Sequence, residues 1–288
     1  MPVPAGASRQ PLQARPARLA RLLPPGPATT PAELVEALGL WRRAGATGVP
    51  RPRVLLNMIS TADGRATLGG RSGAISSPTD RELFHALRAP ADAILVGAGT
   101  IRTERYGPLI PNPDRRAERR AHGLSEEPLA CVVTASLDLD PSTPLLAAPT
   151  TRLVLVTPAQ GELASTACSV EYVREAREGR LDLTAALGQL AERFGVRVLL
   201  CEGGPHLACE LAAAGLLDEL FLSLAPKLAG GPPDTSALRI LAGAELAPPV
   251  ALELLDALES DSHLFLRYGV LAPERVSRET TSSSSDAS

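Results

Sequence analysis

Runs of apolar residues recur along most of the chain and are separated by amphipathic segments. Seven runs predict buried β-strands, at 54–60, 92–97, 130–135, 152–157, 196–201, 218–228 and 263–271. Strands that are apolar throughout are typical of a parallel sheet that is covered on both faces. The last two runs have little helix between them, so we expect them to form an antiparallel edge.

Helix signals lie between these runs. Ser77 is a suitable N-cap, Pro78 suits the first helical position, and a helix that begins there should end near Arg88, because Ala89-Pro90 follows. Further helices are predicted at 31–40, 182–194 and 205–214. Strands that alternate with helices indicate an α/β fold with a mixed, mainly parallel sheet between two layers of helices.

The chain divides into a body and two ends. We expect residues 1–50 to be a partly disordered extension with one short helix, 51–272 to form the catalytic body, and 273–288 to be a disordered tail. The tail is polar and of low complexity, so it cannot bury enough surface to order itself.

Composition excludes several classes of protein. The formal net charge is −3, which gives no general attraction to nucleic acid or to an anionic membrane. No apolar run is long enough to span a bilayer, and no secretory signal follows the first residue. The four cysteines lack a C-x-x-C spacing and the four histidines lack ligand spacing, so we assign no metal and expect a cytoplasmic protein with reduced thiols.

Two predicted strands have glycine residues at their carboxyl ends. Open α/β sheets bind their ligands at the carboxyl ends of strands. The first ends in Gly97-Ala98-Gly99-Thr100, and the second in Glu202-Gly203-Gly204 before a helix that opens at Pro205. Each glycine pair by itself also fits a tight strand–helix turn. Together, at the same edge of one sheet, they favour a dinucleotide or phosphate site.

Three charged residues have more than one interpretation. Arg88 ends a helix, so it either complements the helix dipole or holds a substrate phosphate. Glu104 judged alone is a solvated charge. Glu202 ends a buried strand, where a carboxylate is costly without a partner.

Two stretches, 57–109 and 201–231, carry a resemblance to a known family. "NMISTADGRATLGGRSGAISSPTDRELFHALRAPADAILVGAGTIRTERYGPL" and "CEGGPHLACELAAAGLLDELFLSLAPKLAGG" resemble the pyrimidine reductases of riboflavin biosynthesis, which have a dihydrofolate-reductase-like fold. The resemblance implies a sheet of about eight or nine strands, NADPH as the hydride donor and a homodimer. The implied reaction reduces the ribosylamino group of 5-amino-6-(5-phosphoribosylamino)uracil at C1′ to a ribitylamino group.

The resemblance also implies roles for individual residues. The implied catalytic residues are Asn57, Glu104 and Glu202. The implied substrate-binding residues are Ser72, Arg88, Leu109 and Glu202. The implied cofactor-binding residues are Ile59, Ala74, Gly97, Gly99, Thr100, Glu104, Gly203, Gly204, Pro205, His206 and Leu207.

The chain departs from its bifunctional relatives at three of these positions. They have Lys at the position of Asn57, often an aromatic residue at that of Ala74, and more commonly Asp at that of Glu104. The zinc deaminase half is absent, since there is no H-x-E with P-C-x-x-C. Thr134, Ser136 and Thr157 lie near strand ends where a 2′-phosphate would be selected, on a weak signal.

Two alternative functions stay open. A reductase of the same fold could act on a dihydropterin or dihydrofolate, with Asp63 or Glu202 facing the pterin ring. A non-catalytic NADP(H)-binding protein would keep the glycine turns and lose the substrate-side residues. The presence of Ser72, Arg88 and Glu202 argues against this second alternative.

Overall fold

The computed structural model of the chain describes residues 17–42, 50–231 and 239–271. Within them, eleven strands form one sheet, in the spatial order β2 (Gly26–Thr29), β1 (Leu19–Leu23), β12 (Leu252–Ser260), β13 (His263–Val270), β11 (Glu219–Ala225), β3 (Arg53–Thr61), β10 (Val198–Cys201), β4 (Ala93–Gly97), β5 (Leu129–Val133), β6 (Arg152–Val156) and β7 (Ser169–Val173). A short hairpin, β8 (Ala176–Arg177) and β9 (Arg180–Leu181), stands apart from it. The helices are α1 (Pro31–Ala37), α2 (Pro78–Arg88), α3 (Ala98–Glu104), α4 (Pro113–Ala121), α5 (Pro144–Ala147), α6 (Leu183–Phe194) and α7 (Pro205–Ala213).

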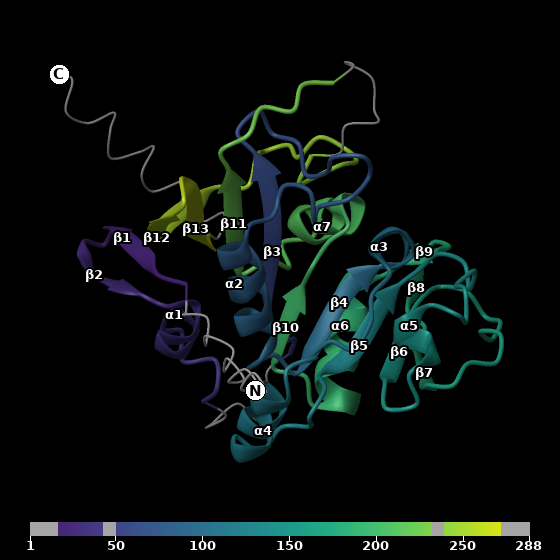
Figure 1. Ribbon diagram of the computed structural model, residues 1–288. Helices are drawn as coiled ribbons and strands as arrows, with labels where there is room; N and C mark the ends of the chain where they lie inside the picture. Colours follow the sequence, from purple (N-terminus) through teal and green to yellow (C-terminus); the bar gives the residue numbers. More distant parts are fainter. Residues whose placement is uncertain (1–16, 43–49, 232–238, 272–288) are drawn as a thin grey trace, which may run out of the picture.

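The sheet is parallel from β11 to β7 and antiparallel from β11 to β2 (Figure 1). The predicted antiparallel pairing of 218–228 with 263–271 is confirmed by β11 and β13. They do not form the edge, however, because β12, β1 and β2 continue the sheet beyond them. The predicted α/β class is confirmed, while the expected eight or nine strands were too few.

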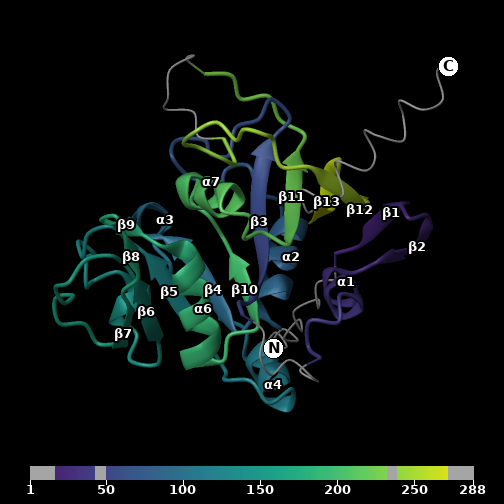
Figure 2. The same cartoon turned by 180° about the vertical axis from the view of Figure 1, so that it is seen from behind.

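Helices cover both faces of the sheet, which gives three layers. Leu83 and Leu87 of α2 pack in one core with Leu55 of β3, and Figure 1 shows α2 in front of that strand. Leu187 of α6 and Leu211 of α7 belong to the second core, on the face seen in Figure 2. Residues of β3 alternate between the two cores, as expected of a strand buried on both faces.

The predicted helix ends are confirmed at α2 and α6. Ser77 caps α2 by accepting a hydrogen bond from the backbone N–H of Asp80. Gly195 follows α6 with a positive φ of 67°, a conformation in which glycine avoids the steric cost of a Cβ atom.

Part of the N-terminal segment belongs to the sheet. The helix predicted at 31–40 is present as α1, and Thr30 and Glu33 form a capping box at its start. The strands β1 and β2 were not predicted, and β1 pairs with β12. The predicted tail at 273–288 lies outside the described residues.

Candidate active site

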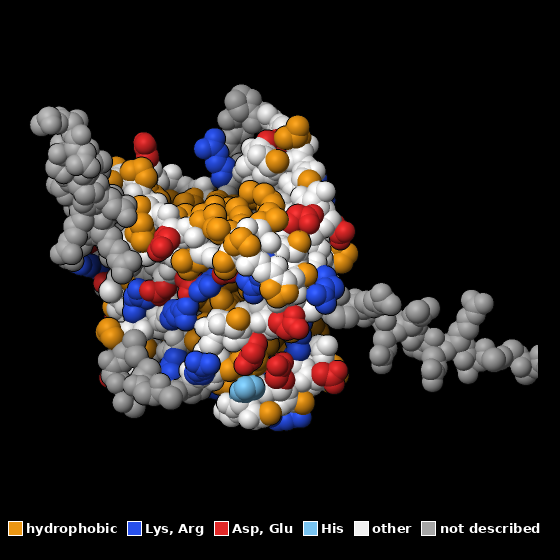
Figure 3. Space-filling model, turned by 90° about the vertical axis from the view of Figure 1, so that its left-hand side faces the viewer, with side chains coloured by type: hydrophobic (Ala, Val, Ile, Leu, Met, Phe, Trp, Pro, Cys, Tyr) orange, Lys and Arg blue, Asp and Glu red, His pale blue; other side chains and the backbone are white. Residues whose placement is uncertain are grey.

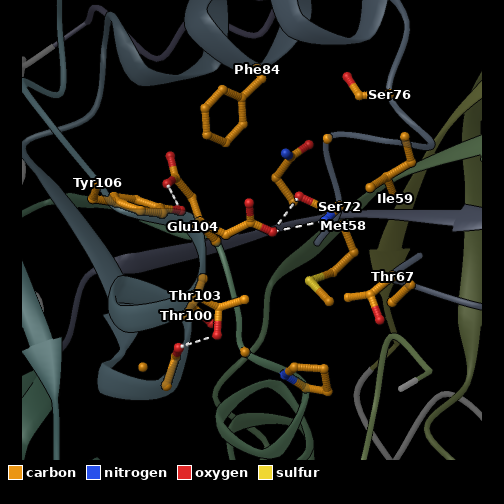
Figure 4. Close-up of a pocket in the computed structure, with 18 of the residues that line it drawn as sticks. Met58, Ile59, Thr67, Ser72, Ser76, Phe84, Thr100, Thr103, Glu104 and Tyr106 are labelled. Atoms are coloured by element: carbon orange, nitrogen blue, oxygen red, sulfur yellow. Dashed lines mark hydrogen bonds between the residues drawn. The ribbon is translucent and has the colours of Figure 1, made fainter. Parts of the chain in front are cut away.

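Three strand ends meet at one edge of the sheet and enclose a cavity of about 570 Å³. The loop after β3, the turn between β4 and α3, and the turn between β10 and α7 form its walls (Figure 4). The two glycine turns contact each other directly, because the N–H of Gly97 donates to the carbonyl of Gly203 at 2.8 Å. The site therefore lies at the carboxyl ends of β3, β4 and β10, where an open α/β sheet binds its ligands.

Glycine is required in the second turn for steric reasons. Gly203 has a φ of 86°, and a Cβ atom there would lie 3.2 Å from Sδ of Met58. A Cβ atom on Gly204 would lie 3.0 Å from Oγ1 of Thr100. A side chain on either residue would therefore crowd Met58 of β3 or Thr100 of α3.

The first turn of α7 opens into the same cavity. Gly204 is its N-cap residue and supplies no side-chain cap. The backbone N–H groups of a first helical turn have no partner within the helix, and the helix dipole adds partial positive charge there. Gly204, Pro205, His206 and Leu207 line the cavity, so this turn offers an anion a place to bind.

Glu202 has the partner that a buried carboxylate needs. Its side chain is 1% exposed and forms a two-pronged ion pair with Arg88, Nε to Oε1 at 2.6 Å and Nη2 to Oε2 at 2.7 Å. Tyr106 Oη donates to Oε2 at 2.7 Å. Three donors therefore hold this carboxylate, and the expectation of a compensating partner is confirmed.

This network shifts the pKa values of its members. Burial and the neighbouring Glu202 carboxylate raise the pKa of Tyr106 well above its usual value. Burial by itself would lower the pKa of Arg88, but the attraction of Glu202 outweighs it and the pKa is raised. Arg88 and Tyr106 both stay protonated as hydrogen-bond donors at neutral pH.

Glu104 and Ser72 form a second polar pair, in the middle of the cavity (Figure 4). The Ser72 backbone N–H and its hydroxyl both donate to Oε1 of Glu104, at 2.8 and 3.0 Å. No described residue forms a hydrogen bond with Oε2 of Glu104. This second oxygen is available to a ligand.

The loop 62–77 is tied to the segment that follows β11. Asp63 accepts hydrogen bonds from the Gly230 N–H at 2.7 Å and the Ala229 N–H at 3.1 Å. Its pKa is lowered to about 2, first by the Thr61 hydroxyl and then by these two N–H groups. Lys227 Nζ donates to the Ala74 carbonyl at 2.9 Å. Asp63 therefore anchors this loop, and it is not among the residues that line the cavity.

Most of the predicted site residues line this one cavity. They are Asn57, Ile59, Ser72, Arg88, Gly97, Gly99, Thr100, Glu104, Glu202, Gly204, Pro205, His206 and Leu207. Three are not in the lining. Gly203 lies behind it against Met58, Leu109 contributes its carbonyl to Arg88 Nη1 at 3.0 Å, and Ala74 is exposed.

Thr134, Ser136 and Thr157 are not in the lining either. The hydroxyl of Thr134 donates to the Ser136 carbonyl, and that of Thr157 accepts from the Ala159 N–H at 3.1 Å. These hydroxyls are engaged within their own turns. The role of these residues in selecting a 2′-phosphate stays a prediction, and it rests only on their position near strand ends.

Sequence reasoning missed Arg81, Phe84 and Tyr106, which also line the cavity. Figure 4 shows the Phe84 ring on the opposite side of the pocket from Thr100 and Thr103. The centroid of this ring lies 4.2 Å from the guanidinium carbon of Arg88. Arg81, Phe84 and Arg88 are spaced at i, i+3 and i+7, so the helical period could have placed them on one face of α2. No pattern pointed to Tyr106, whose partner is 96 residues away.

Among residues 17–42, 50–231 and 239–271, no group of three or more His, Cys, Asp or Glu side chains is placed to hold a metal ion. None of the helices in these ranges combines the length and the apolar character that crossing a bilayer requires.

The sequence of this domain matches a known family model. Residues 52–262 match the RibD C-terminal domain. The chain belongs to this family. The match takes in every wall of the cavity, from β3 to the turn before α7.

Two relatives of this chain are archaeal reductases. The chain is 31% identical over 183 residues to the 2,5-diamino-6-ribosylamino-4(3H)-pyrimidinone 5′-phosphate reductase of Archaeoglobus fulgidus, over 63% of this chain and 83% of that protein. It is 29% identical over 225 residues to the protein of the same name from Methanothermobacter thermautotrophicus, over 76% and 99%. A pyrimidine reductase-like protein from Corynebacterium diphtheriae shares the fold, with a TM-score of 0.66, 24% identity and coverage of 85% and 100%.

Proposed function

We propose that this protein reduces the ribosylamino group of a ribosylaminopyrimidine 5′-phosphate to a ribitylamino group, with NADPH as the reductant. The observation that carries the proposal is the single cavity in which the two glycine turns, Glu104 and the Arg88–Glu202 pair meet. The names of the archaeal relatives support the same chemistry.

The residues at the glycine turns fit a dinucleotide. The uncapped first turn of α7 supplies N–H groups for a diphosphate, and Gly97, Gly99 and Thr100 leave room for close approach of the adjoining sugar and nicotinamide. When bound there, NADPH supplies the hydride for the reduction. Asn57 and Ile59 lie on β3, the strand that forms the opposite wall.

The residues of the chain then orient the substrate and handle charge. Ser72 fixes Oε1 of Glu104, which leaves Oε2 to stabilise positive charge on the substrate's C1′–N group and to exchange a proton with it. Phe84 offers an apolar face to a planar pyrimidine ring. Glu202 is held by Arg88 and Tyr106, and it keeps the wall of the cavity in place.

The pyrimidine ring has two candidate forms. The resemblance in the sequence implied the uracil compound, which has an oxo group at C2, whereas the archaeal relatives are named for a 2,5-diamino compound. Both forms carry the ribosylamino 5′-phosphate that undergoes reduction. The proposal therefore covers the ribosylaminopyrimidine class, and the assay below separates its two members.

The test is NADPH oxidation by the purified protein with three substrates, namely the diaminopyrimidinone phosphate, the aminouracil phosphate and dihydrofolate. We expect turnover of at least one ribosylaminopyrimidine at a rate far above that of dihydrofolate. Glu104→Gln should keep the Ser72 contact through its amide oxygen and lose most of kcat. Faster oxidation with dihydrofolate, or oxidation with none of the three, would refute the proposal.

We also propose that the protein acts as a homodimer in the cytoplasm. Leu22 and Leu23 of β1 and Leu252 and Leu254 of β12 are large apolar side chains with exposures of 52%, 41%, 40% and 39%. Figure 3 looks onto the side of the molecule where these strands lie and shows apolar side chains gathered there. Exposed apolar patches mark sites of association. Light scattering on wild-type protein and on Leu254→Glu should give a dimer and a monomer respectively.

A further inference from the structure

Tyr106 contacts both members of the buried ion pair. Its hydroxyl donates to Oε2 of Glu202 at 2.7 Å, and the centroid of its ring lies 5.3 Å from the guanidinium carbon of Arg88. Tyr106 also belongs to the lining of the cavity. A change at this side chain therefore acts directly on a wall of the site.

The place of Tyr106 in the chain connects it to Glu104. Glu104 is the last residue of α3, and Tyr106 follows it by two positions. Between them, Arg105 has a φ of 51°, a left-handed conformation that ends the helix and turns the chain. Figure 4 shows that Tyr106 and Glu104 both point towards the middle of the pocket. Tyr106 thus links the segment that carries Glu104 to the side chain of Glu202.

The ion pair with Arg88 does not by itself fix Glu202 relative to Glu104. Two parallel hydrogen bonds align the carboxylate with the guanidinium, but Arg88 belongs to α2 and Glu202 follows β10. Among the described residues, two hydrogen bonds join this pair to the segment after α3, through the Leu109 carbonyl and the Tyr106 hydroxyl. Of these two, the Tyr106 hydroxyl is the one that contacts the carboxylate.

Glu202 keeps one acceptor position for a substrate. A carboxylate has about four such positions, and three are taken, by Arg88 Nε on Oε1 and by Arg88 Nη2 and Tyr106 Oη on Oε2. The position that is left lies on Oε1, where Glu202 can accept one N–H or O–H of a substrate. The direction of that hydrogen bond depends on how Arg88 and Tyr106 orient the carboxylate.

The hydroxyl of Tyr106 is suited to hold a contact rather than to give up its proton. Burial and then the neighbouring Glu202 carboxylate raise the pKa of Tyr106 well above its usual value. A raised pKa makes the hydroxyl a weaker acid, and its proton is directed at Glu202. Tyr106 is thus a fixed hydrogen-bond donor at neutral pH.

We propose that Tyr106 is a positioning residue for the reduction, whose hydroxyl holds Glu202 at a set distance from Glu104 so that the two carboxylates contact one substrate molecule together. This inference rests on the proposed function and deepens it. A displacement of about 1 Å in a positioned group can lower a rate by about 100-fold. A contact that ties one carboxylate to the segment of the other therefore matters for the rate.

The first test is the steady-state kinetics of Tyr106→Phe, which removes the hydroxyl and keeps the ring. We expect kcat with the ribosylaminopyrimidine phosphate to fall about 10-fold, because one hydrogen bond to a carboxylate is lost. The KM for NADPH should stay within about twofold of wild type. An unchanged kcat would overturn the inference. A loss of about 1,000-fold or more would also overturn it, since that is the effect of removing a general acid.

The matched control is Tyr172→Phe. The Tyr172 hydroxyl accepts a hydrogen bond from the Leu163 N–H at 2.8 Å, and Tyr172 is not among the lining residues. Both variants lose one hydroxyl and one hydrogen bond of similar length, so both should lose some stability in urea. We expect the loss of kcat in Tyr106→Phe alone, and an equal loss in Tyr172→Phe would contradict the positioning role.

A double-mutant cycle shows whether Tyr106 acts through Glu202. In the Glu202→Gln background, Tyr106→Phe should change kcat by less than about twofold, because the carboxylate that it positions is gone. Calorimetric binding of NADPH shows that each variant is folded, and the assays are run below the Tm of the least stable variant. The same loss of about 10-fold in both backgrounds would mean that Tyr106 does not act through Glu202.

A second measurement separates this inference from the proposed function. The chain has three tyrosines, so ¹⁹F NMR of protein labelled with 3-fluorotyrosine should resolve Tyr106, assigned by its absence in Tyr106→Phe. Its resonance should move in Glu202→Gln and stay in place in Arg120→Ala, which breaks an exposed ion pair with Glu126. This result supports the contact even if no ribosylaminopyrimidine is reduced. A resonance that does not move in Glu202→Gln overturns the inference even if the reductase activity is established.

Discussion

Breaking the pair between Arg88 and Glu202 should destabilise the whole protein. The two side chains are 6% and 1% exposed, so removal of one leaves the charge of the other buried without its counter-ion. Such a change costs about 3–5 kcal/mol. At about 2 °C per kcal/mol for a chain of this size, Glu202→Gln should lower Tm by about 6–10 °C.

The assay is thermal and urea unfolding of the purified variants. The matched control is Arg120→Ala, which breaks a pair with Glu126 whose side chains are 56% and 52% exposed and should cost about 0–1 kcal/mol. The double variant Arg88→Met/Glu202→Leu should be more stable than the sum of its single variants predicts, because no unpaired charge remains in it.

Two results would refute this reasoning. One is a loss below about 1 kcal/mol in Glu202→Gln, since the pair would then behave like an exposed one. The other is additivity of Arg88→Met and Glu202→Leu within about 0.5 kcal/mol, which would mean that the two charges do not stabilise each other.

Three further predictions concern the glycine turn, the loop anchor and the thiols. Gly203→Ala should cost more stability than Gly64→Ala, because both have a positive φ but only Gly203 would also bring a Cβ atom within 3.2 Å of the Met58 sulfur; equal losses in urea unfolding would argue against a steric requirement. Asp63→Asn should remove a stabilisation that is complete above about pH 4 and is lost as the pH falls towards about 2, because the folded-state pKa lies below the ordinary value of 3.8. The difference in Tm between wild type and Asp63→Asn should therefore shrink on acidification, and a constant difference would contradict this. All four cysteines are buried, and burial raises the pKa of Cys201 to about 12, so Ellman's reagent should label none in the native protein and four in denaturant.

The sequence predicted best those elements in which local signals and tertiary packing agree. Five strands could be predicted from the sequence because each is apolar at nearly every position and buried on both faces. They are β3, β4, β5, β6 and β10. The helix α2 could be predicted because its N-cap residue, Ser77, directly precedes it in the sequence. These elements form the centre of the sheet, which explains why the fold class could be predicted.

The elements that were missed obtain their structure from distant neighbours. The segment of β12, "LELLDALES", is rich in Leu, Glu and Ala, which are good helix formers, and it is a strand because β13 and β1 pair with it on either side. The sequence of α4, "PDRRAERRA", is almost entirely polar, which is typical of a surface helix. Its Arg119 is nevertheless 1% exposed and donates hydrogen bonds to the carbonyls of Ala89, Ala91 and Ser125. Neither the strand pairing of β12 nor the hydrogen bonds of Arg119 produce a periodic pattern in the sequence.

The candidate site was predicted in its membership but not in its internal contacts. Strand ends and glycine turns placed Thr100 and Glu202 at one edge of the sheet, because that edge follows from topology alone, whereas Glu104 was assigned only through the family resemblance. The ion pair of Arg88 with Glu202 joins residues 114 apart, and nothing in either local sequence specifies it.

The strand β1 has a consequence for any shortened form of this protein. A form that begins at residue 52, where the family match begins, would lack β1, and residues 257–259 of the nine-residue strand β12 would lose their β1 partners. A long, apolar, open edge is a template for aggregation. With β1 present, the sheet of the described residues ends instead at β2, which is four residues long and contains Pro27, a residue that has no N–H to offer another strand. The strands β1 and β2 thus cover this edge of the sheet and hinder its pairing with a strand of another molecule.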